Sequence, residues 1–143
     1  MSRIISAFPG TGKTYFQKKS PLNVLDSDSS KYSWLAPGIR NPYFPNNYVG
    51  HIRESMDQND IILVSSHKIV RDALVKNGIE YLLVFPERSL KVEYIERFKQ
   101  RGNNEEFINL VSNSWDNWMS ELEEQEGCSK VKLFSGQYLS DIF

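Results

Sequence analysis

Residues 7–14 of this chain, Ala-Phe-Pro-Gly-Thr-Gly-Lys-Thr, have the residue types and the spacing of a loop that binds phosphate groups. Glycines let such a loop wrap with its N–H groups turned inward, toward anionic oxygens. Lys13 can reach the outer phosphates of a nucleoside triphosphate, and the Thr14 hydroxyl can ligate Mg²⁺. The stricter pattern has glycine where this chain has Ala7, a change that many such loops accept. We predict that ATP is bound by Pro9, Gly10, Thr11, Gly12, Lys13 and Thr14, with Thr14 as the metal ligand.

The residues around this loop predict a strand before it and a short helix after it. Apolar runs predict strands at 4–8, 22–25, 60–67, 81–85 and 131–134. Helices are expected at 13–19, about 47–57, about 68–77, 89–100, 104–125 and 136–143, whereas residues 35–48 are expected to be irregular. Strands that alternate with helices predict an α/β fold, in which helices cover both faces of a parallel sheet.

Composition limits the classes of partner. The chain has 17 Lys and Arg against 18 Asp and Glu, which provides no overall basic field for long nucleic acid. One cysteine excludes an internal disulfide. No apolar run approaches the roughly 20 residues that cross a bilayer, and no signal-peptide pattern begins the chain. We expect a single cytoplasmic domain over residues 1–143, without a membrane partner, and the sequence leaves monomer and dimer open.

Polar residues follow several of the predicted strands. Asp26 and Asp28 come after the second strand, and Ser65, Ser66 and His67 end the third. Ligands of parallel sheets bind beyond the carboxyl ends of the strands, so we expect these residues near the loop. Many phosphate-loop enzymes have an aspartate where this chain has Ser65-Ser66-His67. We therefore expect Mg²⁺ to be held by Thr14, phosphates and water, with Ser65 or Asp28 as further candidates.

With these pieces placed, the chain resembles the small P-loop kinases, which include nucleoside monophosphate kinases, shikimate- and gluconate-type kinases and polynucleotide 5′-kinases. It looks most like the short nucleotide kinases of bacteriophages. The matching residues are 7–14, Leu25-Asp26-Ser27-Asp28, 61–67 and the segment from Arg97 to Gly102. The resemblance implies a three-layer αβα P-loop kinase fold with a five-stranded parallel sheet in the order 2-3-1-4-5. It also implies a substrate region at about 26–57 and a mobile lid at about 97–107.

The same resemblance implies roles for single residues. Lys13, Asp28 and Arg101 would be catalytic: Asp28 would orient or deprotonate the acceptor, and Arg101 would reach the phosphates. Arg97 would lie over the adenine ring of ATP. Acceptor-binding residues would be Asp26, Asp28, Arg40, Arg53 and His67.

Each of these residues has a purely structural alternative. Asp28 and His67 can cap helices, and Arg97 can pair with Glu93 on a solvated helix face. Aromatic residues at 34, 43, 44 and 48 can stack on a base or form a small core under a loop. We further expect residues 101–106 to be loose without ligand, because they carry few apolar side chains.

The predicted function is ATP-dependent phosphoryl transfer to a small acceptor, with a nucleoside or deoxynucleoside monophosphate as the first choice. One alternative is a kinase of 5′-hydroxyl groups on nucleic acid or nucleosides, in which Asp28 would be a true base. Another is a regulatory protein that binds ATP without catalysis. Residues 31–57 carry no motif that selects the acceptor.

Overall fold

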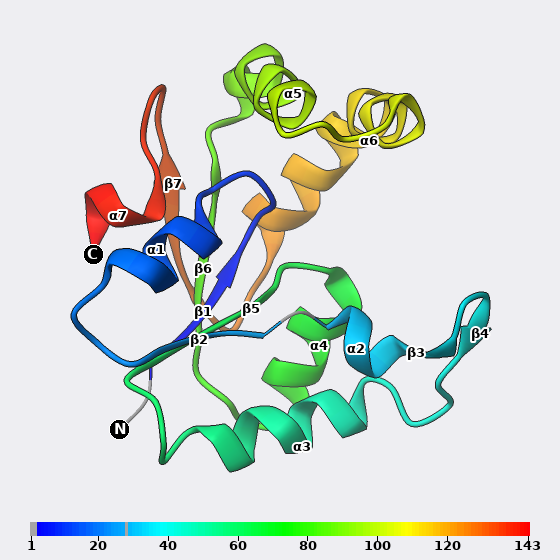
Figure 1. The fold of residues 1–143 in the computed structure, drawn as a ribbon, viewed down its shortest axis with the longest axis vertical. Coiled ribbons are helices and arrows are strands. Elements are labelled where there is room, and N and C mark those ends of the chain that lie inside the picture. Colours follow the sequence, from blue (N-terminus) through cyan, green and yellow to red (C-terminus); the bar gives the residue numbers. More distant parts are fainter. Residues whose placement is uncertain (1–2, 28) are drawn as a thin grey trace.

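The structure, a computed structural model, describes residues 3–27 and 29–143. Its centre is a five-stranded sheet in which every neighbouring pair is parallel. The strands are β1 (Arg3–Ala7), β2 (Val24–Asp26), β5 (Ile61–Ser65), β6 (Leu82–Pro86) and β7 (Ser129–Leu133). They stand in the order β2-β5-β1-β6-β7, with β1 in the middle (Figure 1). The α/β class and the five-stranded parallel sheet predicted from the sequence are confirmed.

The strand numbers differ from the expected order 2-3-1-4-5 because the described residues form two further strands. Residues expected to be irregular make a separate antiparallel hairpin of β3 (Trp34–Ala36) and β4 (Ile39–Arg40). Pro37 and Gly38 form its turn, in which Gly38 has a φ of 78°. Counted along the chain without this hairpin, the strands of the main sheet stand in the order second, third, first, fourth, fifth.

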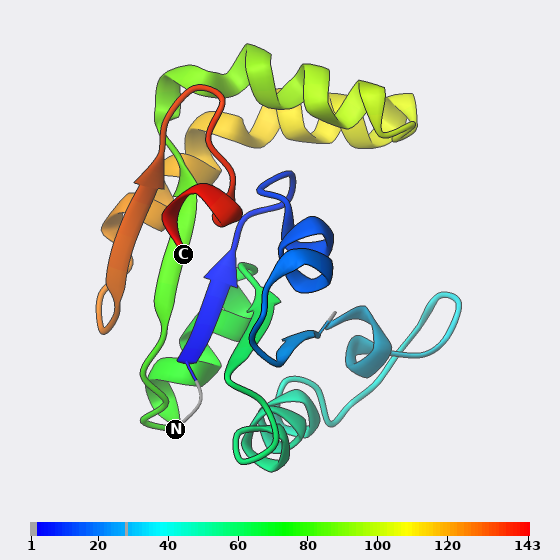
Figure 2. The same ribbon diagram turned by 60° about the vertical axis from the view of Figure 1, so that its left-hand side comes forward.

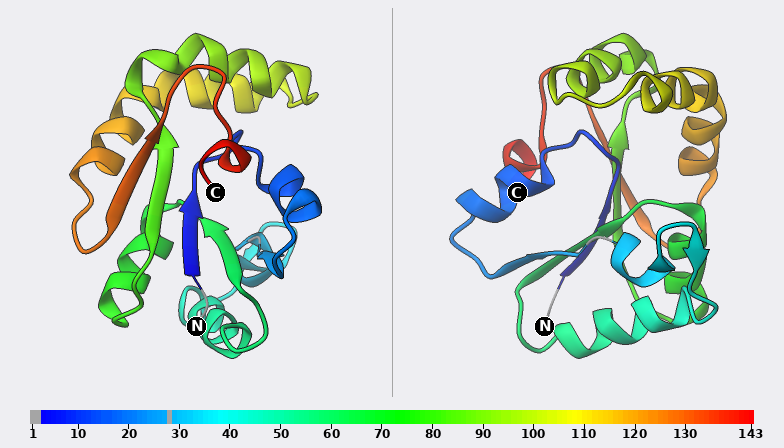
Figure 3. Two further views of the ribbon diagram at one scale, coloured as in Figure 1. Left: turned by 90° about the vertical axis from the view of Figure 1, so that its left-hand side faces the viewer. Right: turned by 45° about the vertical axis from the view of Figure 1, so that its right-hand side comes forward.

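Helices cover both faces of the main sheet, as Figures 2 and 3 show. Alternate residues of each strand point to opposite faces, so Ile4 and Ile62 belong to one core cluster and Ile5 and Leu63 to the other. The first cluster includes residues of α3 (Asn46–Ser55), α4 (Lys68–Lys76), α5 (Lys91–Gln100) and α6 (Glu105–Glu124). The second includes residues of α1 (Lys13–Lys19) and α7 (Leu139–Ile142). The elements are therefore stacked as helices, sheet and helices.

Two short helical turns and one shortened helix were not expected. The described chain adds α2 (Ser30–Ser33) after β2 and a 3-10 turn, η1 (Arg88–Leu90), before α5. Only residues 139–142 of the expected helix at 136–143 are helical. The preceding segment instead passes over the start of α1, where the Leu139 N–H donates to the Thr11 carbonyl at 2.9 Å.

A tight turn joins α5 to α6, where the sequence suggested a loose lid. Gly102 has a φ of 82°, and its N–H donates to the Lys99 carbonyl at 3.0 Å, while the Asn103 N–H donates to Phe98 at 3.1 Å. Such paired bonds close the end of a helix. The Asn104 side chain then accepts from the Phe107 N–H at 2.8 Å and begins α6. The looseness of residues 101–106 stays a prediction, but this turn has hydrogen bonds at both ends.

Helices α5 and α6 lie side by side above the carboxyl end of β1 (Figure 2). They are held together by apolar contacts, including the Phe98 and Phe107 rings, whose centroids are 5.1 Å apart. Among residues 3–27 and 29–143, no helix has the length and apolar character needed to span a bilayer.

The first testable prediction concerns Tyr48 of α3, which fixes the chain after β2. Its buried hydroxyl donates to the Ser27 carbonyl at 2.6 Å. Tyr48→Phe should lower the free energy of unfolding by about 1–3 kcal/mol, because the carbonyl loses this donor inside the protein. Chemical denaturation measures the change. Tyr43→Phe is the control, since Tyr43 is 73% exposed and its loss should change stability by less than about 0.5 kcal/mol. Equal effects of the two substitutions would contradict the prediction.

Candidate functional site

The residues from Ala7 to Thr14, here called the glycine loop, join the end of β1 to the start of α1. Gly10 and Gly12 have φ values of 81° and 87°, in the left-handed region that favours glycine. Thr11 is buried, and its hydroxyl donates to the Phe8 carbonyl at 2.7 Å. Thr11 therefore closes the loop from within rather than facing a ligand through its side chain.

The space around both glycines is also tight. A Cβ atom on Gly10 would lie 3.1 Å from the Phe98 ring and 3.3 Å from the Tyr94 ring. A Cβ atom on Gly12 would lie 3.0 Å from the Tyr138 ring. Aromatic side chains of α5 and of the segment before α7 thus pack closely against the backbone of the glycine loop.

Arg97 of α5 holds the same loop through hydrogen bonds. Its guanidinium donates to the Gly10 carbonyl at 2.8 Å and to Glu93 at 2.9 Å. It lies between two rings, 4.4 Å from the centroid of Tyr94 and 4.0 Å from that of Tyr138. Burial raises the pKa of Tyr94 to about 12, so this ring stays uncharged beneath the cation. The pair with Glu93 that the sequence suggested is present, but the Arg97 side chain is only 10% exposed rather than solvated.

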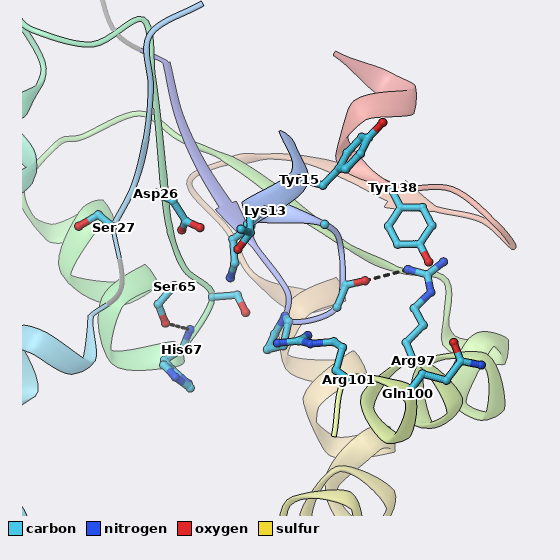
Figure 4. A pocket seen from close by; sticks show the side chains of 15 residues that line it. Lys13, Tyr15, Asp26, Ser27, Ser65, His67, Arg97, Gln100, Arg101 and Tyr138 are labelled. Atoms are coloured by element: carbon cyan, nitrogen blue, oxygen red, sulfur yellow. Dashed lines mark hydrogen bonds between the residues drawn. The ribbon is translucent and has the colours of Figure 1, made fainter. Parts of the chain in front are cut away.

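A cavity of about 680 Å³ opens beside the glycine loop (Figure 4). The predicted site residues that line it are Pro9, Gly10, Gly12, Lys13, Thr14, Asp26, His67, Arg97 and Arg101. Figure 4 shows Lys13, Asp26 and Arg101 entering it from α1, β2 and the end of α5. Lys13 folds toward the loop, where its ammonium group donates to the Ala7 carbonyl at 3.1 Å. Three cationic side chains, those of Lys13, Arg97 and Arg101, therefore line one cavity together with the Asp26 carboxylate.

The wall opposite α5 is formed by the carboxyl ends of β2 and β5. It contains Asp26, Ser27, Ser65, Ser66 and His67. The Ser65 hydroxyl accepts from the His67 N–H at 3.2 Å, which turns the chain from β5 into α4. His67 occupies the position before α4, but its side chain makes no capping bond to that helix. The capping alternative for this side chain is therefore not what the structure has.

Sequence reasoning missed a second layer behind this wall. The Ser27 hydroxyl is 3.0 Å from Nε2 of His51, on α3, and the Tyr32 ring stacks on the His51 ring with centroids 4.8 Å apart. Tyr15, Gln100 and Tyr138 also line the cavity. No motif marks these residues, since they meet only through the fold.

Among the predicted site residues that the structure describes, Thr11, Arg40 and Arg53 do not line the cavity. Arg40 lies on the projecting hairpin β3–β4, with its guanidinium 4.3 Å from the centre of the Trp34 ring. Arg53 donates to the Asn77 carbonyl at 2.9 Å and so closes the end of α4. Asp28 lies outside the described residues. The aromatic residues between 34 and 48 divide, because Trp34 and Tyr43 are exposed whereas Phe44 and Tyr48 join the core.

The cavity offers oxygen donors to a metal ion. Thr14 contributes a hydroxyl and Asp26 a carboxylate, which are the donor types that Mg²⁺ prefers. Within the described part of the chain, no group of three or more His, Cys, Asp or Glu residues could hold a metal. Thr14 and Asp26 therefore fit an ion that keeps several water ligands and takes its remaining ligands from phosphate oxygens.

Comparisons with known proteins add no assignment. No protein-family model matches the chain, and no curated protein matches it. A function for this site therefore has to be argued from its residues and their geometry.

The second prediction concerns Glu93, which joins α5 to the segment after β7. The Ser135 hydroxyl, the Gly136 N–H and Arg97 all donate to its carboxylate. The Ser135 bond, followed by the Gly136 and Arg97 contacts, holds the Glu93 pKa below its usual value, against the opposing effect of desolvation. The resulting stability is present above the unfolded-state pKa of about 4.3 and is lost as pH falls through the lower, folded-state pKa.

Glu93→Gln should therefore lower the melting temperature at pH 7, and its difference from the wild type should shrink as pH falls below about 4. Glu96→Gln on the same helix is the control. Glu96 pairs with Lys99 in an exposed ion pair, and such a pair contributes little to stability. Thermal unfolding at a series of pH values provides the comparison. A difference that stays constant with pH would show that the carboxylate charge has no part in this junction.

Proposed function

We propose that this protein is a phosphotransferase with the fold of a P-loop kinase. It would transfer the terminal phosphoryl group of ATP to a small acceptor, and we propose a nucleoside or deoxynucleoside monophosphate as that acceptor. The observation that carries the proposal is the glycine loop itself, whose Lys13 and Thr14 share one cavity with Asp26 and Arg101. The sequence motif at residues 7–14 does not by itself require Asp26 and Arg101 to lie in the same cavity as the loop.

The glycine loop supports the nucleotide part of the proposal. Backbone N–H groups at the first turn of a helix have no partner within it, and those of a glycine-rich turn can point at one anion. Lys13 adds a full positive charge at this point. Thr14 and Asp26 would hold Mg²⁺, which neutralises negative charge on the phosphates when bound. Arg97 supports this site indirectly, because it fixes the Gly10 carbonyl.

Phosphoryl transfer depends mainly on positioning and on stabilising negative charge, which suits this cavity. An acceptor oxygen forms a bond to the terminal phosphorus, the bond from that phosphorus to its bridging oxygen breaks, and ADP leaves. Lys13 enters from α1 and Arg101 from the end of α5, so cations would flank the group in transfer (Figure 4). An acceptor that is already a phosphate needs no strong base, and the serine-rich wall at Ser27, Ser65 and Ser66 suits it.

The direct test incubates the protein with Mg²⁺ and ATP labelled on its terminal phosphate, together with a panel of acceptors. The panel contains nucleoside monophosphates, nucleosides, sugars and 5′-hydroxyl oligonucleotides, and mass spectrometry identifies the labelled product. A labelled nucleoside diphosphate is expected. A labelled 5′-phosphate would assign the protein to hydroxyl kinases instead. ATP binding without transfer to any acceptor would favour a regulatory protein, and absence of ATP binding would overturn the proposal.

A third prediction tests the role of Lys13. Lys13→Ala should raise the ATP dissociation constant at least about tenfold, because the site loses one charge-assisted contact to phosphate. Isothermal titration calorimetry measures the constant, and thermal unfolding should show little change. Lys18→Ala is the matched control on the exposed end of α1 and should bind ATP as the wild type does. Unchanged affinity in Lys13→Ala would remove the main support for the nucleotide site.

A fourth prediction separates binding from transfer at Arg101. Arg101→Ala should lower kcat by about 10²-fold or more, because its charge is needed most when negative charge builds up on the group in transfer. The dissociation constant of ATP should change by less than about threefold. Steady-state kinetics and calorimetry test the two quantities. The control is Lys99→Ala, which removes an exposed cation of α5 that pairs with Glu96; equal losses in both variants would reduce Arg101 to a general surface charge.

A further inference from the structure

A second cavity lies against the back of the glycine loop and has a different character. Its volume is about 270 Å³, and it is enclosed by α4, α5 and α6. The apolar residues that line it are Phe8, Phe98, Phe107, Leu110, Val111, Trp118 and Leu122. It shares Pro9, Ser66 and His67 with the larger cavity, so the two meet at the turn from β5 into α4. Nothing in the nucleotide site described above uses this space.

Aromatic rings from the glycine loop, α5 and α6 line it. The Phe8 and Trp118 rings meet edge to face, with centroids 6.2 Å apart, and the Phe98 and Phe107 rings do the same at 5.1 Å. Phe8, Phe98 and Val111 belong to the buried core, which keeps these walls in place. Rings arranged in this way offer both faces and edges to a further ring between them.

The polar residues at its rim do not favour a second phosphate. Arg71 is the main buried cation there, with a side chain only 3% exposed. Its guanidinium already donates to the Ser66 carbonyl at 2.8 Å and to the Gln125 side chain at 2.6 Å, and it lies 3.7 Å from the Glu121 carboxylate. Its charge and donors are therefore largely satisfied within the protein, and the carboxylate would repel an anion.

Its size indicates one flat group rather than a whole nucleotide. An apolar cavity of about 150 Å³ is enough to bind benzene, whereas sites for drug-sized ligands have about 300–1,000 Å³. A volume of about 270 Å³ suits a single or fused aromatic ring. The polar junction at Ser66 and His67 suits the more polar part of the same molecule, which would continue into the larger cavity.

We propose that this second cavity binds the aromatic ring of the acceptor, and that the ring is a nucleobase. The acceptor phosphate would then lie in the larger cavity, on the side of Ser66 and His67. This inference rests on the proposed function, and it adds where the acceptor base is recognised. The other aromatic cluster has less to offer a base, because the His51 ring already stacks on the rings of Tyr32 and Tyr48, with centroids 4.8 and 6.3 Å apart.

The experiment compares ligands that differ only in the ring. Isothermal titration calorimetry measures binding of AMP, GMP, CMP and UMP, and of ribose 5-phosphate, which keeps the sugar and phosphate but lacks the base. At least one nucleotide should bind the wild type about tenfold or more tightly than ribose 5-phosphate, which is the size of effect that stacking on aromatic residues provides. ATP binding is measured on the same samples.

Two matched substitutions locate the ring. Phe107→Leu removes an aromatic wall of the second cavity. Phe44→Leu removes a partly buried ring that packs beside Tyr48 against the same core cluster but does not line that cavity. Phe107→Leu should reduce the preference for the nucleotide about fivefold or more, whereas Phe44→Leu should leave it unchanged. Near-ultraviolet circular dichroism checks that both variants fold.

Tryptophan fluorescence tests the same point by a second, independent readout. A bound base should quench Trp118, because this residue lines the cavity, and Trp118→Phe should lose that part of the signal. Quenching that is identical in Trp118→Phe would overturn the inference. Equal affinity for ribose 5-phosphate and every nucleotide would do so too, as would equal losses in both leucine variants or a loss confined to Phe44→Leu. Normal ATP binding alongside any of these results would leave the proposed function standing, whereas a wild type that binds no ATP would end it.

Discussion

The structure of this site depends on a close approach that only glycine permits. Gly10 and Gly12 bring the backbone of the glycine loop against Phe98, Tyr94 and Tyr138, where a Cβ atom would lie only 3.0–3.3 Å from the rings. Glycine therefore suits these two positions for two reasons, the positive φ values and the close contacts with the rings. The bond from Arg97 to the Gly10 carbonyl then fixes the loop to α5. A loop shaped in this way keeps its N–H groups in one arrangement, which saves the conformational entropy that a flexible loop would lose on binding an anion.

These same contacts limit how α5 can move. A lid that swung as a body from residue 97 would have to break the bonds of Arg97 to the Gly10 carbonyl, the Glu93 carboxylate and the Gln137 carbonyl. Arg101 lies one helical turn further along, next to the turn at Gly102, and is free of those particular bonds. If the site closes around a ligand, a movement of Arg101 and the turn at Gly102 would break fewer hydrogen bonds than a movement of the whole helix pair.

The features that could be predicted from the sequence are those formed by residues close together in the chain. The buried strands β5 and β6 are continuous apolar runs because helices cover both of their faces, so their positions could be read directly. The glycine loop could also be found, since its residues are adjacent in the chain. The contacts that support the loop and the cavity wall could not be predicted, because they join residues far apart in the chain. Arg97 and Gly10 are 87 residues apart, and Ser27 and His51 are 24 residues apart. Arg40 and Arg53 lie away from the cavity, and their residue type could not show this. A basic residue type does not reveal that the Arg40 guanidinium lies over the Trp34 ring or that Arg53 donates to the Asn77 carbonyl.

The supports of the glycine loop come from the far end of the chain. Residues 7–14 are synthesised well before two of their partners, because Gly12 packs against Tyr138 and the Thr11 carbonyl accepts from the Leu139 N–H. A growing chain on the ribosome would expose the loop long before these partners exist. The full set of contacts around the glycine loop would therefore form only after residue 139 has been synthesised, and a chain that stopped before Tyr138 would lack these two supports.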